Sequence, residues 1–158
     1  ECAVSQLMSG EELYQQTKII AAHRFMSPAQ AWPKLDRDVT VVREEDGPAG
    51  SLLFSCHMDQ SMVNPMGIVH GGITASLVDT CMGITCSAQR ESMACPTISM
   101  TVNYARPVPP NVDVWVRVRT VRLGASSGQL SAELFLPEKP EELLVTATGI
   151  YSIKKPRL

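Results

Sequence analysis

The chain has 158 residues, of which 44% are hydrophobic and 19% are charged. This is the composition of a globular protein, and the length fits one domain, 1–158, with a helical extension over 1–37 and a core over 38–155. The net charge of -2 argues against a broad nucleic-acid-binding surface, because such surfaces are strongly basic. No apolar run approaches the ~20 residues that a membrane-spanning helix needs.

Five cysteines, at positions 2, 56, 81, 86 and 95, form an odd set without a Cys-x-x-Cys pair. This pattern argues against a disulfide framework and favours a reducing compartment. We therefore expect a cytoplasmic protein, with a mitochondrial location as the alternative. The Cys and His spacings match no zinc site, and neither GxGxxG nor GxxxxGK[ST] is present, so we expect no metal and no cofactor.

The first half of the chain predicts a helix and a hairpin. Residues 9–26 read as a helix, in which Ser9 and Glu12 have the spacing of a capping box. Two strand-like segments follow, 38–46 and 50–58, around a glycine-containing turn. We expect these two segments to pair as antiparallel strands.

Residues 70–89 are small or apolar on every side, which is the signature of a buried helix. Four segments with strand character come after it, at 97–104, 112–123, 129–136 and 143–153. Short links between them favour antiparallel pairing. The expected fold is α+β, with an antiparallel sheet of about six strands wrapped around one long central helix and an extra N-terminal helix. In the first of these strands, alternation places Thr97 on the face opposite Ile98 and Met100.

Asp79 is the only formally charged side chain between Gly67 and Ala88, with His70 taken as neutral. A carboxylate in an apolar helix is costly unless it is paired or has a chemical task. Asp79 is therefore a candidate general base. The alternative is a structural aspartate that satisfies nearby backbone groups.

The second candidate feature is the glycine pair Gly71–Gly72, which follows Asn64 and His70 at the expected start of the helix. Bare N–H groups at a helix start, with the helix dipole behind them, can stabilise a developing oxyanion. Asn64 could hold a water or a carbonyl group. The alternative is a glycine turn that only shapes the chain.

Asp79 lies eight residues after Gly71, which is about 12 Å along a helix. Reacting atoms must come within about 3–3.5 Å, so one chain cannot easily bring both residues to one carbonyl group. Two antiparallel copies of the helix, related by a two-fold axis, could do so. If both residues act, the sequence predicts an obligate dimer with two shared sites.

The segment 64–79, NPMGIVHGGITASLVD, resembles the signature of hotdog-fold acyl-CoA thioesterases of the PaaI-like branch, which includes the thioesterase-superfamily-member type. The pattern N-x-x-G-x-x-H-G-G-x-x-x-x-x-x-D is matched at every fixed position. The segment 101–107, TVNYARP, is similar to the strand that follows the central helix in that family. The resemblance covers roughly 38–153.

The resemblance implies a role for each matched residue. Asn64 and the Gly71 N–H would bind and polarise the thioester carbonyl group. Asp79 of the facing chain would act as a general base on water or as a nucleophile, and the two routes are not separable by sequence. Thr97 would help orient the attacking water. His70 would mainly fix the loop beside the substrate.

The resemblance also implies an acyl-CoA substrate bound at a subunit interface and a homotetramer built as a dimer of dimers. Gly72 is expected near the substrate, and Arg106 and Arg122 near the phosphates of coenzyme A. Met82, with the small residues around it, suggests an adaptable apolar acyl pocket. Whether the acyl group is fatty or aromatic stays open.

Two other functions compete with thioester hydrolysis. A hotdog hydratase or dehydratase would pair a catalytic histidine with an acid on the central helix, which His70 and Asp79 permit. A non-catalytic acyl-CoA-binding module would keep the fold without the reaction. The HGG pattern favours hydrolysis over the hydratase reaction, and the intact set of Asn64, Gly71 and Asp79 argues against the binding module.

Overall fold

The computed structural model describes residues 7–24, 39–42, 48–90 and 95–153. Its elements follow the predicted order of one helix, a hairpin, the long helix and four strands. In chain order they are α1 (Gly10–Arg24), β1 (Thr40–Val42), β2 (Ser51–Met58), the short 3-10 helix η1 (Gln60–Met62), α3 (Gly71–Gln89), β3 (Thr97–Tyr104), β4 (Val112–Leu123), β5 (Ser127–Phe135) and β6 (Val145–Ser152).

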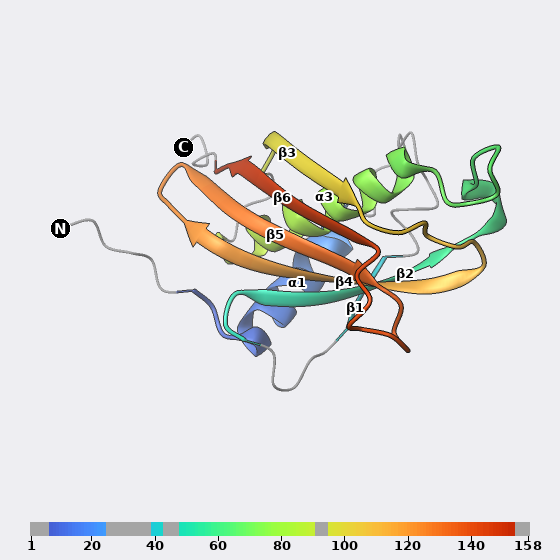
Figure 1. The fold of residues 1–158 in the computed structure, drawn as a ribbon. Helices are drawn as coiled ribbons and strands as arrows, with labels where there is room; N and C mark the ends of the chain where they lie inside the picture. Colours follow the sequence, from blue (N-terminus) through green and yellow to red (C-terminus); the bar gives the residue numbers. More distant parts are fainter. Residues whose placement is uncertain (1–6, 25–38, 43–47, 91–94, 154–158) are drawn as a thin grey trace.

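The six strands form one antiparallel sheet in the order β1-β2-β4-β5-β6-β3. The sheet curves around α3, which lies against its concave face (Figure 1). Because α3 is enclosed in this way, its apolar residues are buried on most sides, as Leu77 and Val78 are. The inward-facing positions of β4, Val114, Val116 and Val118, complete the core as the alternation predicted. The α+β fold expected from the sequence is confirmed.

The N-terminal helix α1 begins with the predicted capping box. The Glu12 N–H donates to Ser9 Oγ at 3.4 Å, and the Ser9 N–H donates to Glu12 Oε2 at 3.0 Å. Leu13 is fully buried, and α1 packs against α3. The Met8 N–H also donates to the Gln89 side chain at the end of α3. The described part of the extension, 7–24, is therefore anchored to the central helix.

The β3 strand forms the edge of the sheet, and most of its residues are exposed in the single chain. Ile98 is 62% exposed, which is unusual for a large apolar side chain in a strand. A β-bulge between Thr97 and Ser99 shifts the register against β6, so that Thr97 pairs with Tyr151 and Met100 pairs with Gly149.

This register corrects one sequence expectation. Tyr151 and Gly149 lie two residues apart and so point to the same face of the sheet. Their partners Thr97 and Met100 therefore share that face as well, whereas simple alternation placed them on opposite faces. The bulge turns Thr97 toward α3.

Cys56, Cys81, Cys86 and Cys95 are all buried. Burial raises the pKa of the Cys81 thiol well above its ordinary value, which makes Cys81 an inert core residue. In the described part of the chain, no cluster of His, Cys, Asp and Glu could hold a metal ion, and no helix there is long and apolar enough to cross a membrane.

Candidate active site

A cavity of about 400 Å³ opens between the start of α3 and the end of β3. It is lined by three of the predicted site residues, Asn64, Gly71 and Arg106. The other lining residues are mainly apolar: Met66, Ile68, Val69, Thr74, Tyr104, Ala105, Pro107 and Val108. The cavity thus combines a few polar groups with an apolar wall, as small-molecule sites do.

The loop before α3 fixes the orientation of the Asn64 side chain. Asn64 Oδ1 accepts a hydrogen bond from the Met66 N–H at 2.9 Å. The Gly67 N–H donates to the Asn64 carbonyl oxygen, and Gly67 adopts a positive φ of 79° that closes this tight turn. With Oδ1 held in this way, the side-chain NH₂ is the group that Asn64 can offer to an acceptor in the cavity.

The first turn of α3 leaves one backbone donor for a ligand. His70 is the N-cap, and its Nδ1 accepts from the Gly72 N–H at 2.9 Å. The N–H groups of Ile73 and Thr74 donate to the His70 carbonyl oxygen. Within the described residues, only the Gly71 N–H of this turn makes no hydrogen bond in the chain, so it is the donor that can polarise a substrate oxygen.

Tyr104, at the end of β3, contacts Gly71 through its hydroxyl and its ring. Its hydroxyl donates to the Gly71 carbonyl oxygen at 2.8 Å. A Cβ atom at Gly71 would lie 3.4 Å from the Tyr104 ring, so the ring packs directly against this residue. The sequence reasoning did not single out Tyr104 as a site residue, although it ends a strand next to the segment that contains Arg106.

Asp79 lies about two turns further along α3 than Gly71 and is half-buried. Thr97 Oγ1 donates to Asp79 Oδ1 at 2.7 Å, and the Tyr151 hydroxyl donates to the same oxygen at 2.9 Å. The structure therefore brings Thr97 to the carboxylate, and it adds Tyr151, which no sequence motif marks as a site residue. Burial, followed by the charge of Asp79, raises the pKa of the Tyr151 phenol well above its ordinary value, so the phenol stays protonated as a donor.

Asp79 does not line the cavity that holds Asn64 and Gly71. A single chain therefore presents two separate groups of polar residues along α3. One group surrounds the helix start and offers hydrogen-bond donors. The other surrounds Asp79 and offers a carboxylate.

The remaining predicted residues lie in different places. Arg106 lines the cavity, and its guanidinium pairs with Glu142 at 3.2 Å. Arg122 is exposed and lies near the C-terminal end of β4. Met82 is fully buried in the core and does not line this cavity. The N–H of Gly72 is already used by His70.

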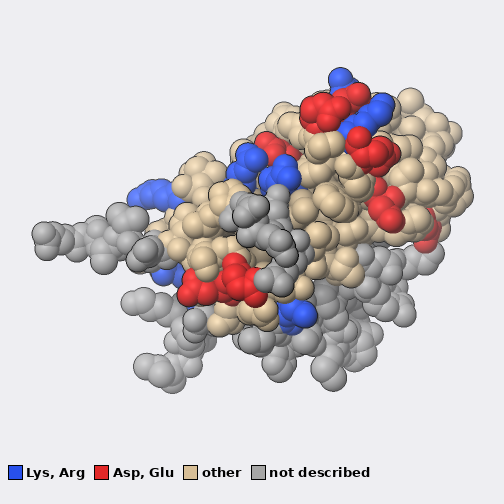
Figure 2. All heavy atoms as spheres, turned by 90° about the horizontal axis from the view of Figure 1, so that it is seen from below, with Lys and Arg blue, Asp and Glu red and all other residues tan. Residues whose placement is uncertain are grey.

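Charged side chains of both signs are interspersed on the surface in Figure 2. Arg106 pairs with Glu142, Lys139 also lies 3.7 Å from Glu142, and Arg119 pairs with Glu133. The charge of Arg106, which lines the cavity, is therefore partly neutralised by Glu142 in the single chain.

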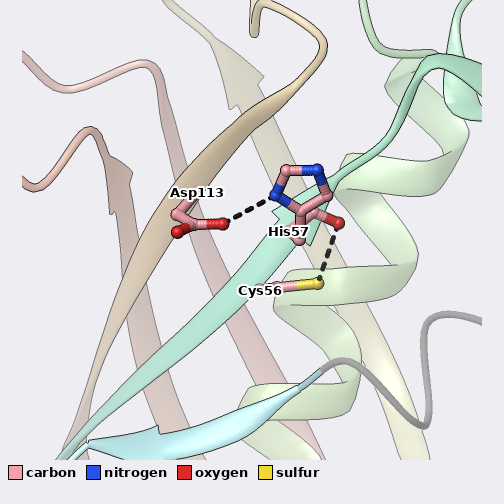
Figure 3. Close-up of polar contacts among 3 residues, drawn as sticks. All are labelled: Cys56, His57 and Asp113. Carbon is pink, nitrogen blue, oxygen red and sulfur yellow. Dashed lines mark hydrogen bonds and ion pairs between the residues drawn. The ribbon is translucent and has the colours of Figure 1, made fainter.

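A cysteine, a histidine and an aspartate also lie close together on β2 and β4 (Figure 3). His57 Nδ1 is 2.7 Å from Asp113 Oδ1, and both side chains are more than half exposed. The Cys56 thiol is buried and donates to the His57 backbone carbonyl oxygen at 3.8 Å, not to the imidazole ring. Successive residues of a strand face opposite ways, so this group is not a Cys–His nucleophile pair.

Comparison with known proteins agrees with this architecture. Residues 66–142, just under half of the chain, match the family model of the thioesterase superfamily. Zebrafish thioesterase superfamily member 2 is 16% identical with a TM-score of 0.71, over 93% of this chain and 99% of that chain. The PaaI protein from the phenylacetic acid degradation operon of E. coli is 17% identical with a TM-score of 0.72, over 90% and 96%.

A conserved protein from Pseudomonas aeruginosa is 25% identical with a TM-score of 0.65, over 83% of this chain and 98% of that chain. No curated protein sequence matches the chain. The family match and the shared architecture agree with the resemblance seen in the segment 64–79. The chain thus has the hotdog fold of the PaaI-like structures, and over 66–142 it is similar to the thioesterase superfamily.

Proposed function

We propose that the protein hydrolyses an acyl-CoA thioester to a free carboxylic acid and coenzyme A, in a site shared between two subunits. The observation that carries this proposal is the Gly71 N–H, which donates no hydrogen bond to the described residues. Gly71 lines the cavity together with Asn64. A thioester carbonyl oxygen accepting from both groups would be polarised, and its developing negative charge would be stabilised.

Asp79 is the group that brings about attack on the carbonyl carbon, either as a general base or as a nucleophile. As a general base, it takes a proton from a water that adds to the carbonyl carbon. The tetrahedral intermediate then breaks its C–S bond, the CoA thiolate leaves and takes up a proton, and the acid is released. As a nucleophile, Asp79 instead attacks the carbonyl carbon, the C–S bond breaks to release the CoA thiolate, and water then hydrolyses the mixed anhydride that is left. Both routes need only water, so we propose a hydrolase without a cofactor.

Because of their distance along α3, the donor group at Gly71 and the carboxylate of Asp79 must come from different chains to act on one carbonyl group. Gly71 and Asp79 are eight residues apart, or about 12 Å along the helix. We propose that a second copy pairs with the exposed β3 edge and places its α3 antiparallel to the first. Gly71 of one subunit would then meet Asp79 of the partner subunit. Two such dimers would make the tetramer that the resemblance implies, with Arg106 near the CoA phosphates.

The structure weighs against the hydratase alternative. A catalytic histidine in such an enzyme needs a free ring nitrogen near its acid. His70 Nδ1 already accepts from the Gly72 N–H as the helix N-cap, so in the neutral ring Nε2 carries the proton and cannot act as a base. His70 therefore serves the helix start.

The test is thiol release from short, long and aromatic acyl-CoAs by the wild type, Asp79→Asn and Asp113→Asn. Asp113 is the matched control, because it is an exposed carboxylate on the sheet. We expect Asp79→Asn to lower kcat by at least about 100-fold, the usual scale for an acid–base group, while CoA binding is kept. Asp113→Asn should keep full turnover. Tight CoA binding by a wild type that releases no thiol would instead identify a binding module.

A further inference from the structure

The Asp79 carboxylate is held at one of its two oxygens. Thr97 Oγ1 and the Tyr151 hydroxyl both donate to Oδ1, at 2.7 and 2.9 Å. The phenol also lies 3.3 Å from the Asp79 backbone oxygen, but it has one proton, and the carboxylate is the nearer acceptor. Within the described part of the chain, Oδ2 receives no hydrogen bond.

The fold places Tyr151 at this position through the sheet. Tyr151 stands directly opposite Thr97 in the β3–β6 pair, so both side chains point from the same face toward α3. Two glycines make room for the ring. A Cβ at Gly149 would lie 2.7 Å from the ring, and one at Gly83 would lie 3.6 Å from it. The ring leans over Gly149 and brings its hydroxyl to the carboxylate.

Tyr151 is fully buried, whereas Asp79 is only partly so. A buried hydrogen bond to a charged group is stronger than one exchanged with water, and it fixes the orientation of its acceptor. The carboxylate therefore has one oxygen fixed by two donors and one oxygen that receives no hydrogen bond from the described residues.

We propose that Tyr151 is a positioning residue, which together with Thr97 fixes Asp79 Oδ1 and so presents Oδ2 to the attacking water or to the carbonyl carbon. This inference rests on the proposed thioesterase activity. Tyr151 does not touch the substrate. It acts by keeping the carboxylate in the one orientation in which Oδ2 reaches the reacting atoms of the facing subunit.

The test compares Tyr151→Phe with Thr85→Val in steady-state hydrolysis of the best acyl-CoA found for the wild type. Phenylalanine fills the same space and removes only the hydroxyl. Thr85 is the control, because its hydroxyl is also buried in α3 but donates only to the Cys81 carbonyl oxygen. We expect Tyr151→Phe to lower kcat about 10-fold or more with KM within about twofold, the scale of one lost hydrogen bond to a charged group. Thr85→Val should leave both constants unchanged.

Gly149→Ala is a second variant, which keeps the Tyr151 hydroxyl but crowds the ring. It should also lower kcat. A wild type without activity on any acyl-CoA would overturn both the proposed function and this inference. An active wild type with an equally active Tyr151→Phe would overturn the inference alone. A Tyr151→Phe chain that fails to fold, or that changes only KM, would also overturn it, since the hydroxyl would then serve stability or binding.

Discussion

The Tyr104 hydroxyl donates a 2.8 Å hydrogen bond to the Gly71 carbonyl oxygen and ties the end of β3 to the first residue of α3. The ring also lies 3.4 Å from where a Gly71 Cβ would be. The hydrogen bond holds the peptide group that follows Gly71, and the ring packs beside its Cα. We expect this contact to help orient the Gly71 N–H proposed for the thioester carbonyl group.

Removing the Tyr104 hydroxyl should weaken catalysis moderately. In Tyr104→Phe the ring stays against Gly71, but the helix start loses one neutral hydrogen bond, worth about 0.5–1.5 kcal/mol. We expect kcat/KM to fall about 3- to 10-fold, less than for Asp79→Asn. Tyr14→Phe on α1, far along the chain from this cavity, is the control in the same assay. Equal kcat/KM for Tyr104→Phe and the wild type would show that the contact does not aim the donor.

His70 should be replaceable by another N-cap residue. The Gly72 N–H needs an acceptor, which His70 Nδ1 supplies at 2.9 Å. His70→Ala should cost about 1 kcal/mol of unfolding free energy, measured by urea denaturation, whereas His70→Asn should cost much less because asparagine caps well. If His70→Asn is stable but inactive, the imidazole has a chemical role beyond capping.

The two glycines beside Tyr151 should respond to alanine in opposite ways. At Gly149 the new Cβ would lie 2.7 Å from the ring and 3.3 Å from Met82, so crowding should cost about 1–3 kcal/mol. At Gly83 the nearest atom is at 3.6 Å, an ordinary contact, and alanine favours the helix by up to about 1 kcal/mol. Thermal unfolding of both variants tests this. A Gly149→Ala chain as stable as Gly83→Ala would refute the packing described for the ring.

Ionisation of Tyr151 should lower the free energy of unfolding at high pH. Its pKa is raised in the folded chain by burial and by Asp79, so its contribution is fully present below the ordinary tyrosine pKa of about 10 and is lost as the pH rises above that value. In Tyr151→Phe the unfolding free energy should fall less steeply above pH ~10, by up to about 1.4 kcal/mol per pH unit. Urea denaturation between pH 8 and 11 measures both slopes. Parallel curves would contradict the raised pKa.

Much of the fold could be predicted from the sequence, because its signals are local. The capping box at Ser9, the alternation in 112–123 and the proline and glycine turns each act within a few residues. They placed the other five strands and both long helices close to their observed bounds, whereas most of the first predicted strand, 38–46, and the end of the first predicted helix, 25–26, lie outside the described residues. The motif in 64–79 also indicated the family.

The missed features depend on long-range pairing. The bulge beside Thr97 exists only because β3 pairs with β6, and it reverses the face that alternation assigns to Thr97. Tyr104 reaches a residue 33 positions away, and Tyr151 reaches one 72 positions away. A sequence pattern carries no record of such contacts. Met82 likewise looked suited to an acyl pocket, but the curvature of the sheet encloses it in the core.

The central claim is that each site combines Asn64 and Gly71 of one chain with Asp79 of the other. Mixing Asn64→Ala and Asp79→Asn chains, by joint refolding from urea, tests it most directly. Each mixed dimer would contain one intact site, so random pairing should restore about a quarter of wild-type thioesterase activity from two inactive parents. No recovery in a mixture that demonstrably contains mixed dimers would contradict a shared site.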